Sequence, residues 1–230
     1  MDNYLTVDLL EKSVVDDMVS QFSSCTWKSG ADGGGHKYKL NAEMSREGPY
    51  TELDNIIGEA LVSNIDLSTF TLSSGATNTI FSKTGIGGQY PLHTDHAALG
   101  HYSVTTFLSD PDEYEGGELQ LYMNGIVNNF KLEKGKSIIY YSGTPHAVSK
   151  VTKGERRVAV NWLLSNYLDS DIREIVRYLK MTMNYYDDFG EDTSERAYEE
   201  VRNHPQCLGK TAIAAIERKF HMNHSQGRGG

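Results

Sequence analysis

Hydrophobic positions in the first part of the chain recur with the period of a helix. Between Leu9 and Phe22 apolar residues return every four positions, and a second apolar stripe follows Thr51. Asp54, three residues after Thr51, resembles the last residue of a capping box. Residues 30–35 are glycine-rich but lack the strand-to-helix context of a phosphate-binding loop. These patterns predict two helices with a flexible loop between them.

The middle of the chain changes to short β-rich runs separated by turn residues. Asn124-Gly125 lies between two of these runs and is a strong signal for a two-residue hairpin turn. The runs lie at residues 69–72, 77–81, 104–108, 118–123, 126–132, 137–141 and 157–164. Roughly eight short strands behind two helices favour a mainly β fold with flanking helices. We expect a double-stranded β-helix, or jelly roll, with the N-terminal helices packed on one sheet.

Helical periodicity returns after Ser170, and two further helical stretches are predicted at 193–201 and 211–220. The glycine-rich end from Ser225 onward is expected to be disordered. The chain should therefore form one domain with three parts. These are N-terminal helices and a Gly-rich loop over residues 1–66, a jelly-roll core over 67–166, and a helical C-terminal extension over 167–230.

Composition excludes several classes of protein. With 230 residues, 38% of them hydrophobic, the chain can bury a full core. Its formal net charge of -9 is unfavourable for nonspecific binding to nucleic acid. Cys25 and Cys207 show no C-x-x-C spacing, which favours free thiols in a reducing compartment. No secretory signal or bilayer-spanning apolar stretch is visible. We expect a cytoplasmic protein without nucleic-acid or membrane partners.

The first candidate for chemistry is the pair His93 and Asp95. Residues two apart on an extended strand project from the same face, so both side chains should point the same way. A distant second histidine, His146, could complete a 2-His-1-carboxylate set, which leaves other metal positions open and favours non-haem Fe(II). Each residue alone could instead be an ordinary turn residue, since H-x-D occurs by chance in many proteins.

Arg156 is the second candidate. A turn at Lys153-Gly154 predicts that His146 and Arg156 lie on neighbouring antiparallel strands. A buried arginine near a metal suits a planar, bidentate partner, namely a carboxylate. On the last strand Arg156 and Trp162 share one face, so Trp162 should line the same cavity.

Three segments resemble those of 2-oxoglutarate/Fe(II)-dependent dioxygenases. They are Y-x-x-H-x-D from Tyr90, the run F-L-S-D-P-D-E-Y-E-G-G-E-L from Phe107 to Leu119, and H-x-V-x-x-V-T-x-G-x-R from His146 to Arg156. More narrowly, they are similar to the prolyl-4-hydroxylase-like branch, including its bacterial PKHD-type hydroxylases. The resemblance covers residues 70–165.

The resemblance implies a role for each candidate residue. His93, Asp95 and His146 would bind Fe(II), and Arg156 would pair with the distal carboxylate of 2-oxoglutarate. Tyr90 and Trp162 match a tyrosine before the H-x-D motif and a cavity tryptophan, which places them at the cofactors. The implied enzyme uses O2, with ascorbate as reductant, to hydroxylate a residue of a protein or peptide, proline being the first candidate. Succinate and carbon dioxide would be released.

One departure from the family pattern and two alternative functions stay open. Lys83 and Thr84 stand where many relatives carry a tyrosine that contacts 2-oxoglutarate, so the remaining co-substrate contacts are unassigned. The prime substrate could also be a free amino acid or small metabolite. A non-catalytic, metal-binding jelly-roll module is the other alternative. A cupin-type isomerase fits less well, because it would have extra histidine ligands and no need of Arg156.

Overall fold

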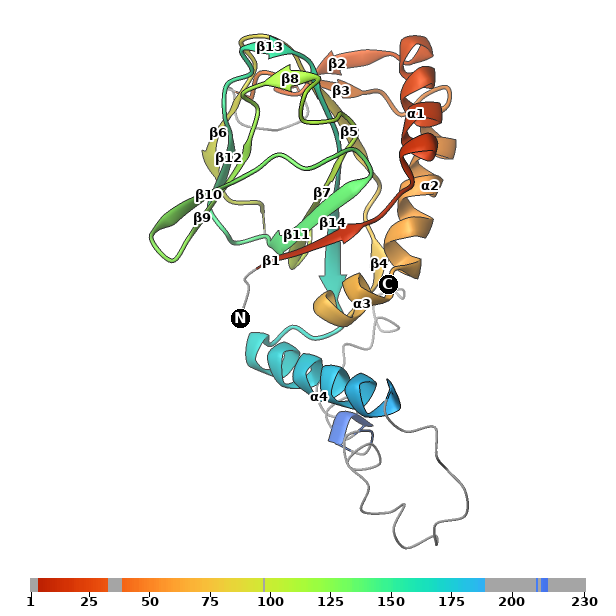
Figure 1. Cartoon of the computed structure of the whole chain (residues 1–230), viewed down its shortest axis with the longest axis vertical. Coiled ribbons are helices and arrows are strands. Elements are labelled where there is room, and N and C mark those ends of the chain that lie inside the picture. Colours follow the sequence, from red (N-terminus) through yellow and green to blue (C-terminus); the bar gives the residue numbers. More distant parts are fainter. Residues whose placement is uncertain (1–3, 33–38, 97, 189–209, 211, 215–230) are drawn as a thin grey trace, which may run out of the picture. The chain divides into compact units, whose positions relative to one another are not determined.

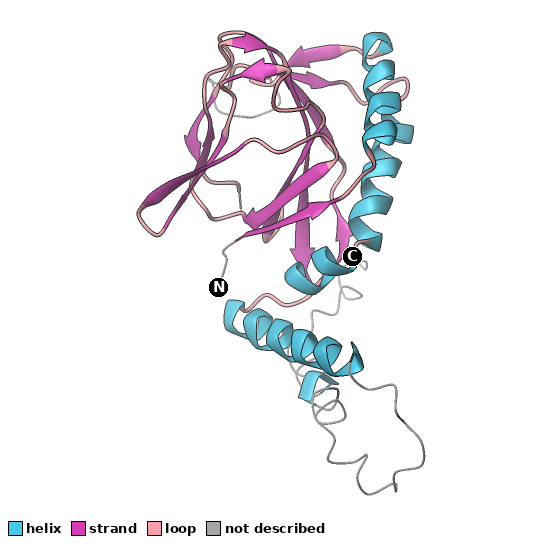
Figure 2. Cartoon of the chain, viewed as in Figure 1, coloured by secondary structure: helices cyan, strands magenta, loops and turns pink. Residues whose placement is uncertain are grey.

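The computed structural model describes residues 4–32, 39–96, 98–188, 210 and 212–214. The chain divides into two compact units, one formed by residues 1–67 and 75–164 and the other by 68–74 and 165–230. Antiparallel strands dominate the first unit (Figures 1 and 2). No helix in this described part of the chain is long and apolar enough to cross a membrane.

Two sheets build the first unit. In spatial order, the major sheet contains β1 (Tyr4–Asp8), β11 (Lys136–Tyr141), β7 (Tyr102–Phe107), β14 (Arg156–Ser165), β5 (Ile80–Thr84), β3 (Ala42–Met44) and β2 (Trp27–Ser29). The minor sheet contains β10 (Ile126–Phe130), β9 (Leu119–Met123), β12 (His146–Val148) and β6 (Tyr90–His93). Neighbours in both orders pair antiparallel. This is the arrangement expected of a jelly roll.

Apolar side chains from both sheets meet in the core between them. The central cluster consists of Phe107, Leu119, Leu121, Ile138, Tyr140 and Val158. Side chains at alternate positions of β5 point to the opposite side, where α1 (Lys12–Ser20), the 3-10 helix η1 (Gln21–Ser24) and α2 (Tyr50–Ser63) lie (Figure 2). There the ring of Phe81 contacts Phe22 and Tyr50 edge-on, with centroids 5.9 and 6.0 Å apart. The N-terminal helices therefore pack on one sheet, as predicted.

The hairpin predicted at Asn124-Gly125 is present. Met123 of β9 pairs with Ile126 of β10, which leaves the two predicted residues as the turn. Both have positive φ, 53° for Asn124 and 75° for Gly125. A two-residue turn of this hand needs exactly such residues, so the strand register follows from local chemistry.

Several boundaries predicted from the sequence are wrong. Of the run 69–72, residues 69–71 are helical, because Asn64 Oδ1 accepts a hydrogen bond from Leu67 N (2.9 Å) and caps α3 (Ile65–Thr71). Strand β5 lies three residues later than the predicted run 77–81. The predicted capping box is also wrong: Asp54 accepts a hydrogen bond from Thr79 N (2.7 Å), which fixes α2 to the chain entering β5.

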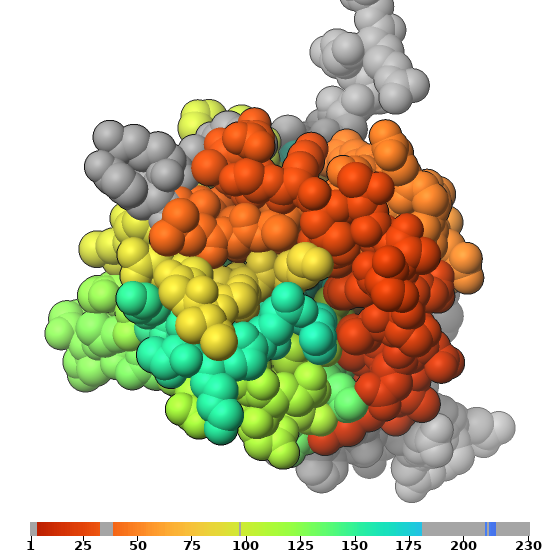
Figure 3. Space-filling view, turned by 90° about the horizontal axis from the view of Figure 1, so that it is seen from above, coloured from red at the N-terminus to blue at the C-terminus, as the bar shows by residue number. Residues whose placement is uncertain are grey.

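One end of the jelly roll is covered by β8 (Tyr114–Glu115) and β13 (Lys153–Gly154), which pair with each other. Figure 3 looks at this end and shows the yellow segment before β6 beside the teal segment before β14. Two backbone hydrogen bonds join them: Val151 N to Gly88 O (2.9 Å) and Gly87 N to Val151 O (2.8 Å). The chain thus leaves the minor sheet after β12, crosses this end and enters the major sheet as β14.

The second unit contains α4 (Ser170–Asp188), as the periodicity after Ser170 predicts. Val176 of this helix is fully buried against Leu72 and Tyr167. Strand β4 (Ser73–Ala76) spans the boundary between the units. Residues 212–214 are helical, within the predicted stretch 211–220, and residue 210 just before it is helical too. The predicted helix 193–201, the loop glycines 33–35, Cys207 and the C-terminal tail lie outside the described residues.

Candidate active site

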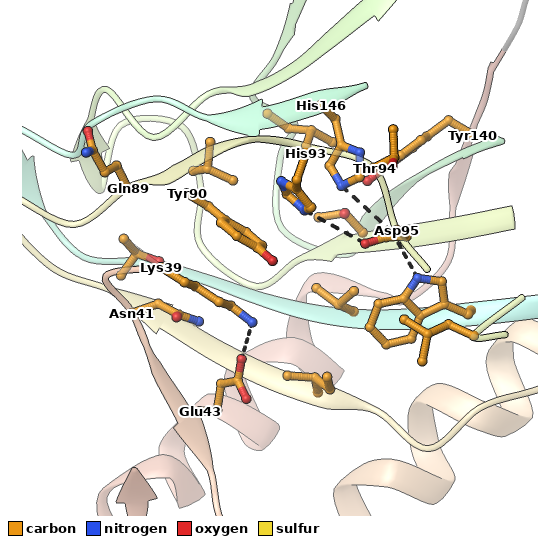
Figure 4. Close-up of a pocket in the computed structure, with 18 of the residues that line it drawn as sticks. Lys39, Asn41, Glu43, Gln89, Tyr90, His93, Thr94, Asp95, Tyr140 and His146 are labelled. Carbon is orange, nitrogen blue, oxygen red and sulfur yellow. Dashed lines mark hydrogen bonds and ion pairs between the residues drawn. The ribbon is translucent and has the colours of Figure 1, made fainter. Parts of the chain in front are cut away.

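A cavity of about 540 Å³ lies between the inner faces of the two sheets, entirely within the first unit (Figure 4). Its size is within the range of small-molecule sites. All six residues singled out in the sequence line it: Tyr90, His93, Asp95, His146, Arg156 and Trp162. The cavity therefore unites residues that lie far apart along the chain.

His93, Asp95 and His146 form a cluster with the dimensions of a metal site. One ligand atom from each residue lies within 4.8 Å of the others. The Nε2 atoms of both histidines are 3.8 Å from carboxylate oxygens of Asp95. The histidines face each other because they are register partners at the ends of β6 and β12. Asp95 follows the end of β6 and is held by its backbone N–H, which donates to Ser142 O (3.1 Å).

Both histidines are oriented by a backbone carbonyl. His93 Nδ1 lies 2.8 Å from Pro91 O, and His146 Nδ1 lies 2.8 Å from Thr144 O. A carbonyl can only accept, so each Nδ1 must carry the proton and each Nε2 keeps its lone pair for a metal. Burial, with the neighbouring His146, lowers the pKa of His93 to about 4. His93 is therefore neutral near pH 7, as a metal ligand has to be.

The Asp95 carboxylate is held by two donors from the opposite sheet. Its Oδ2 accepts hydrogen bonds from Ser103 Oγ (2.5 Å) and from Trp162 Nε1 (2.9 Å). Ser103 Oγ in turn lies 2.9 Å from Ser142 Oγ. These contacts fix the plane of the carboxylate. The sequence indicates Trp162 through its position on the last strand, but gives no signal for Ser103.

Removing either donor is expected to weaken metal binding. Partners that orient metal ligands typically contribute 10–100-fold to affinity, so Ser103→Ala and Trp162→Phe should each weaken Mn(II) binding by about tenfold. Calorimetric titration of the metal-free protein measures this directly. Thr106→Val is the matched control, since it removes a buried hydroxyl that bonds Ser137 on the other face of β7. Equal affinity for Mn(II) in the wild-type protein and all three variants would contradict this role for Ser103 and Trp162.

Arg156 lies on the other sheet, so the prediction that it neighbours His146 on adjacent strands is wrong. The turn at Lys153-Gly154 belongs to β13, and the chain changes sheets before β14 begins with Arg156. Arg156 therefore faces the histidines across the cavity (4% exposed). Its register partner on β5 is Thr84, which lines the same cavity.

The guanidinium of Arg156 lacks an acidic partner. No carboxylate of a described residue is within ion-pair distance of it, and its Nε is buried without a hydrogen bond. Burial lowers the pKa of Arg156 from its usual value, although arginine stays charged in proteins. A buried cation without a counter-charge is costly, so this site is suited to a carboxylate ligand.

Gly117, directly before Glu118, leaves room for the side chain of Arg156. Gly117 has φ +68°, and a Cβ there would lie 3.1 Å from Arg156 Cδ and 3.0 Å from the ring of Tyr114. The other side of the guanidinium lies 5.7 Å from the ring centroid of Phe107. The segment from Phe107 to Leu119 therefore shapes the pocket around this arginine.

Two tyrosines complete the surroundings. The ring of Tyr90 stacks on His93 with centroids 3.7 Å apart. Tyr140, which sequence reasoning missed, lines the cavity with its ring edge toward His146 at 5.2 Å, and burial raises its phenol pKa. At the two departure positions, Thr84 faces the cavity, whereas Lys83 points away and its ammonium lies 4.3 Å from the ring centroid of Trp27.

Comparison with known proteins agrees with this geometry. The model of the 2OG-Fe(II) oxygenase superfamily matches residues 79–164, which contain the cluster and Arg156. A PKHD-type hydroxylase of Prochlorococcus marinus is 33% identical over 184 residues, covering 76% of this chain and 83% of the relative. The chain belongs to the 2-oxoglutarate/Fe(II)-dependent oxygenases, among the PKHD-type hydroxylases.

Solved structures share the fold of this oxygenase. A prolyl hydroxylase of Trichoplax adhaerens, in complex with a peptide fragment of the hypoxia inducible factor oxygen degradation domain, gives a TM-score of 0.59 at 15% identity, covering 72% of this chain and 84% of that chain. HygX of Streptomyces hygroscopicus, with nickel, 2-oxoglutarate and hygromycin B bound, gives 0.51 at 9% identity, covering 69% and 81%. The predicted family, enzyme class and jelly-roll fold are therefore confirmed.

The side chains present fit the cofactors of this family. Two imidazoles whose Nε2 atoms are free and one carboxylate are the donor set that non-haem Fe(II) takes. The orphaned Nε of Arg156, in the same cavity, fits an acidic co-substrate such as 2-oxoglutarate.

Proposed function

We propose that this oxygenase hydroxylates a residue within a protein or peptide, with proline as the first candidate, and releases succinate and carbon dioxide. In this proposal His93, Asp95 and His146 bind Fe(II), and Arg156 binds the distal carboxylate of 2-oxoglutarate. The observation that carries it is the pairing, in one cavity, of a three-ligand cluster with a buried arginine that has no acidic partner among the described residues. Ascorbate is the proposed reductant that maintains Fe(II).

In this proposal the residues of the chain bind the metal and the co-substrate, orient them, and exclude water from the cavity. The carbonyls of Pro91 and Thr144 aim the histidine Nε2 atoms at one point, and Ser103 and Trp162 fix the carboxylate of Asp95. Arg156 anchors the co-substrate from the opposite sheet. When bound, iron and 2-oxoglutarate supply the oxidising power that inserts one oxygen atom of O2 into a C–H bond. Apolar walls such as Leu119 and Val160 keep the cavity dry around that bond.

A peptidyl target is supported by the relatives, which are PKHD-type hydroxylases, and by the peptide complex of the Trichoplax enzyme, whose fold this chain shares. The charged side chains of the cavity support an uncharged target. Among the described residues these are Lys39, Glu43, Asp95 and Arg156, whose charges cancel. A dication and a dianionic co-substrate would leave this balance unchanged, so the net charge of the cavity attracts neither an anionic nor a cationic target.

Mass spectrometry of a peptide library tests this function. The purified protein is incubated with Fe(II), 2-oxoglutarate and ascorbate, and with end-capped peptides that each contain one proline. The expected result is succinate together with peptides heavier by one oxygen atom, located on proline by fragmentation. Matched peptides with alanine in place of proline are the control. Oxidation of free amino acids but of no capped peptide would contradict the peptidyl function and favour the metabolite alternative.

A further inference from the structure

Part of the cavity wall is formed by residues outside the set assigned to the metal and the co-substrate. At the edge of the major sheet, Lys39, Asn41 and Glu43 present their side chains to the cavity from β3 and the residues just before it. Figure 4 shows them beneath the ring of Tyr90, while the histidines come from the minor sheet on the other side. Asn41 is engaged in structure, since its Nδ2 donates to Ser82 Oγ (2.6 Å). Lys39 and Glu43 remain to be explained.

Lys39 and Glu43 form an ion pair inside the cavity. Their side chains are 16% and 9% exposed. The Lys39 ammonium also lies 5.1 Å from the ring centroid of Tyr90, and that ring stacks on His93. The ammonium is thus one aromatic ring away from a metal ligand. Glu43 and Tyr90 fix it in the wall of the cavity that holds the cluster.

An ion pair at this depth is unfavourable as a purely structural device. Removing the charges from water still costs several kcal/mol per ion after the protein relaxes, and apolar residues of similar size often give equal or higher stability. An ammonium carries three N–H donors. Glu43 accepts one of them, which leaves further donors for an acceptor within the cavity.

We propose that Lys39, held in place by Glu43, donates a hydrogen bond to a carbonyl or carboxylate oxygen of the prime substrate. This inference rests on the proposed function and names the group by which the substrate is recognised. In a peptide that oxygen is a main-chain carbonyl near the target residue. In a free amino acid it is the α-carboxylate. The balanced charges of the cavity favour the neutral carbonyl of the peptide.

The test compares Lys39→Met with Lys83→Met. Both remove an ammonium from neighbouring parts of the major sheet, but Lys83 lies on the opposite face of β5 and outside the cavity. A third protein, Lys39→Met with Glu43→Gln, removes both charges and so avoids leaving Glu43 buried and unpaired. Two substrate pools are used: end-capped tripeptides with each amino acid at the centre, and the free amino acids. Binding of 2-oxoglutarate is measured separately by calorimetry with Mn(II) in place of iron.

We expect both Lys39 proteins to raise KM for the prime substrate at least about tenfold, the effect of losing one hydrogen bond to a charged group. Their Kd for 2-oxoglutarate should match that of Lys83→Met, the melting temperature of the double variant should match that of the wild-type protein, and Lys39→Arg should restore part of the lost affinity. If the free amino acids alone are oxidised and this depends on Lys39, the subsite stands and the peptidyl function fails.

Three results would overturn the subsite itself. The first is peptide oxidation with the same KM in the Lys39 and Lys83 proteins, which leaves the peptidyl function intact. The second is a higher Kd for 2-oxoglutarate in Lys39→Met, which would assign Lys39 to the co-substrate. The third is oxidation of neither pool by a wild-type protein that converts 2-oxoglutarate to succinate, because every member of both pools carries the acceptor oxygen.

Discussion

Asp95→Ala should abolish metal binding and, with it, the formation of succinate from 2-oxoglutarate. Asp95 supplies the negative charge of the cluster, and both histidine Nε2 atoms are 3.8 Å from its carboxylate. Without it, two imidazoles alone remain to hold a dication, and the hydrogen bonds from Ser103 and Trp162 lose their acceptor. We expect the affinity for Mn(II) to fall more than about a hundredfold, beyond the loss caused by removing a supporting partner alone.

The control for this variant is Asp112→Ala, which removes an exposed carboxylate outside the cavity. Titration of metal-free protein with Mn(II), followed by a succinate assay with Fe(II), gives both readouts. His146→Ala should behave like Asp95→Ala, because His146 provides a ligand atom of the same cluster. Turnover at the wild-type rate in Asp95→Ala would rule out this cluster as the iron site.

Arg156→Met should remove 2-oxoglutarate binding without destabilising the metal-free protein. The guanidinium is buried and no carboxylate of a described residue neutralises it, so its replacement by an apolar side chain removes a costly charge. The melting temperature should therefore stay constant or rise. Because a guanidinium makes two parallel hydrogen bonds to a carboxylate, we expect Kd for 2-oxoglutarate to rise by about a hundredfold or more.

The neighbouring residue provides a matched control. Arg157 pairs with Glu155 and Glu113 on the outside of the jelly roll, so Arg157→Met should leave 2-oxoglutarate binding unchanged. Calorimetric titration of Mn(II)-loaded protein with 2-oxoglutarate measures whether Arg156 binds the co-substrate. Thermal unfolding of the metal-free protein measures whether Arg156 stabilises the fold. A lower melting temperature with unchanged affinity in Arg156→Met would show that Arg156 is structural.

The candidate site could be predicted because its ligands lie in short motifs. His93 and Asp95 are two apart, and the motif around His146 carries Arg156 at a fixed offset, so all four could be named before their positions in space were known. The position of Arg156 relative to the three metal ligands could not be predicted. A turn at Lys153-Gly154 predicts that His146 and Arg156 lie on neighbouring strands of one sheet. In the jelly roll the chain instead passes from one sheet to the other here, and Lys153-Gly154 pairs with β8.

Supporting residues leave no local signal in the sequence. Ser103 reaches Asp95 from the other sheet, and Lys39, in the irregular segment before β3, meets Glu43 of that strand, so both contacts depend on the finished fold. The strands that were missed are short, such as β2, β3, β8 and β13, and their backbone groups are paired by neighbours distant in the chain. Propensity within two to five residues carries too little information to indicate them. The hairpin at Asn124-Gly125 was predictable because the turn itself dictates the register.

A crystal structure of the protein with Mn(II) and 2-oxoglutarate tests the central claim most directly. We predict anomalous density for the metal within bonding distance of Nε2 of His93, Nε2 of His146 and a carboxylate oxygen of Asp95. The distal carboxylate of 2-oxoglutarate should lie on the guanidinium of Arg156. Metal bound elsewhere, or 2-oxoglutarate in the cavity with its distal carboxylate away from Arg156, would contradict the assignment of this site.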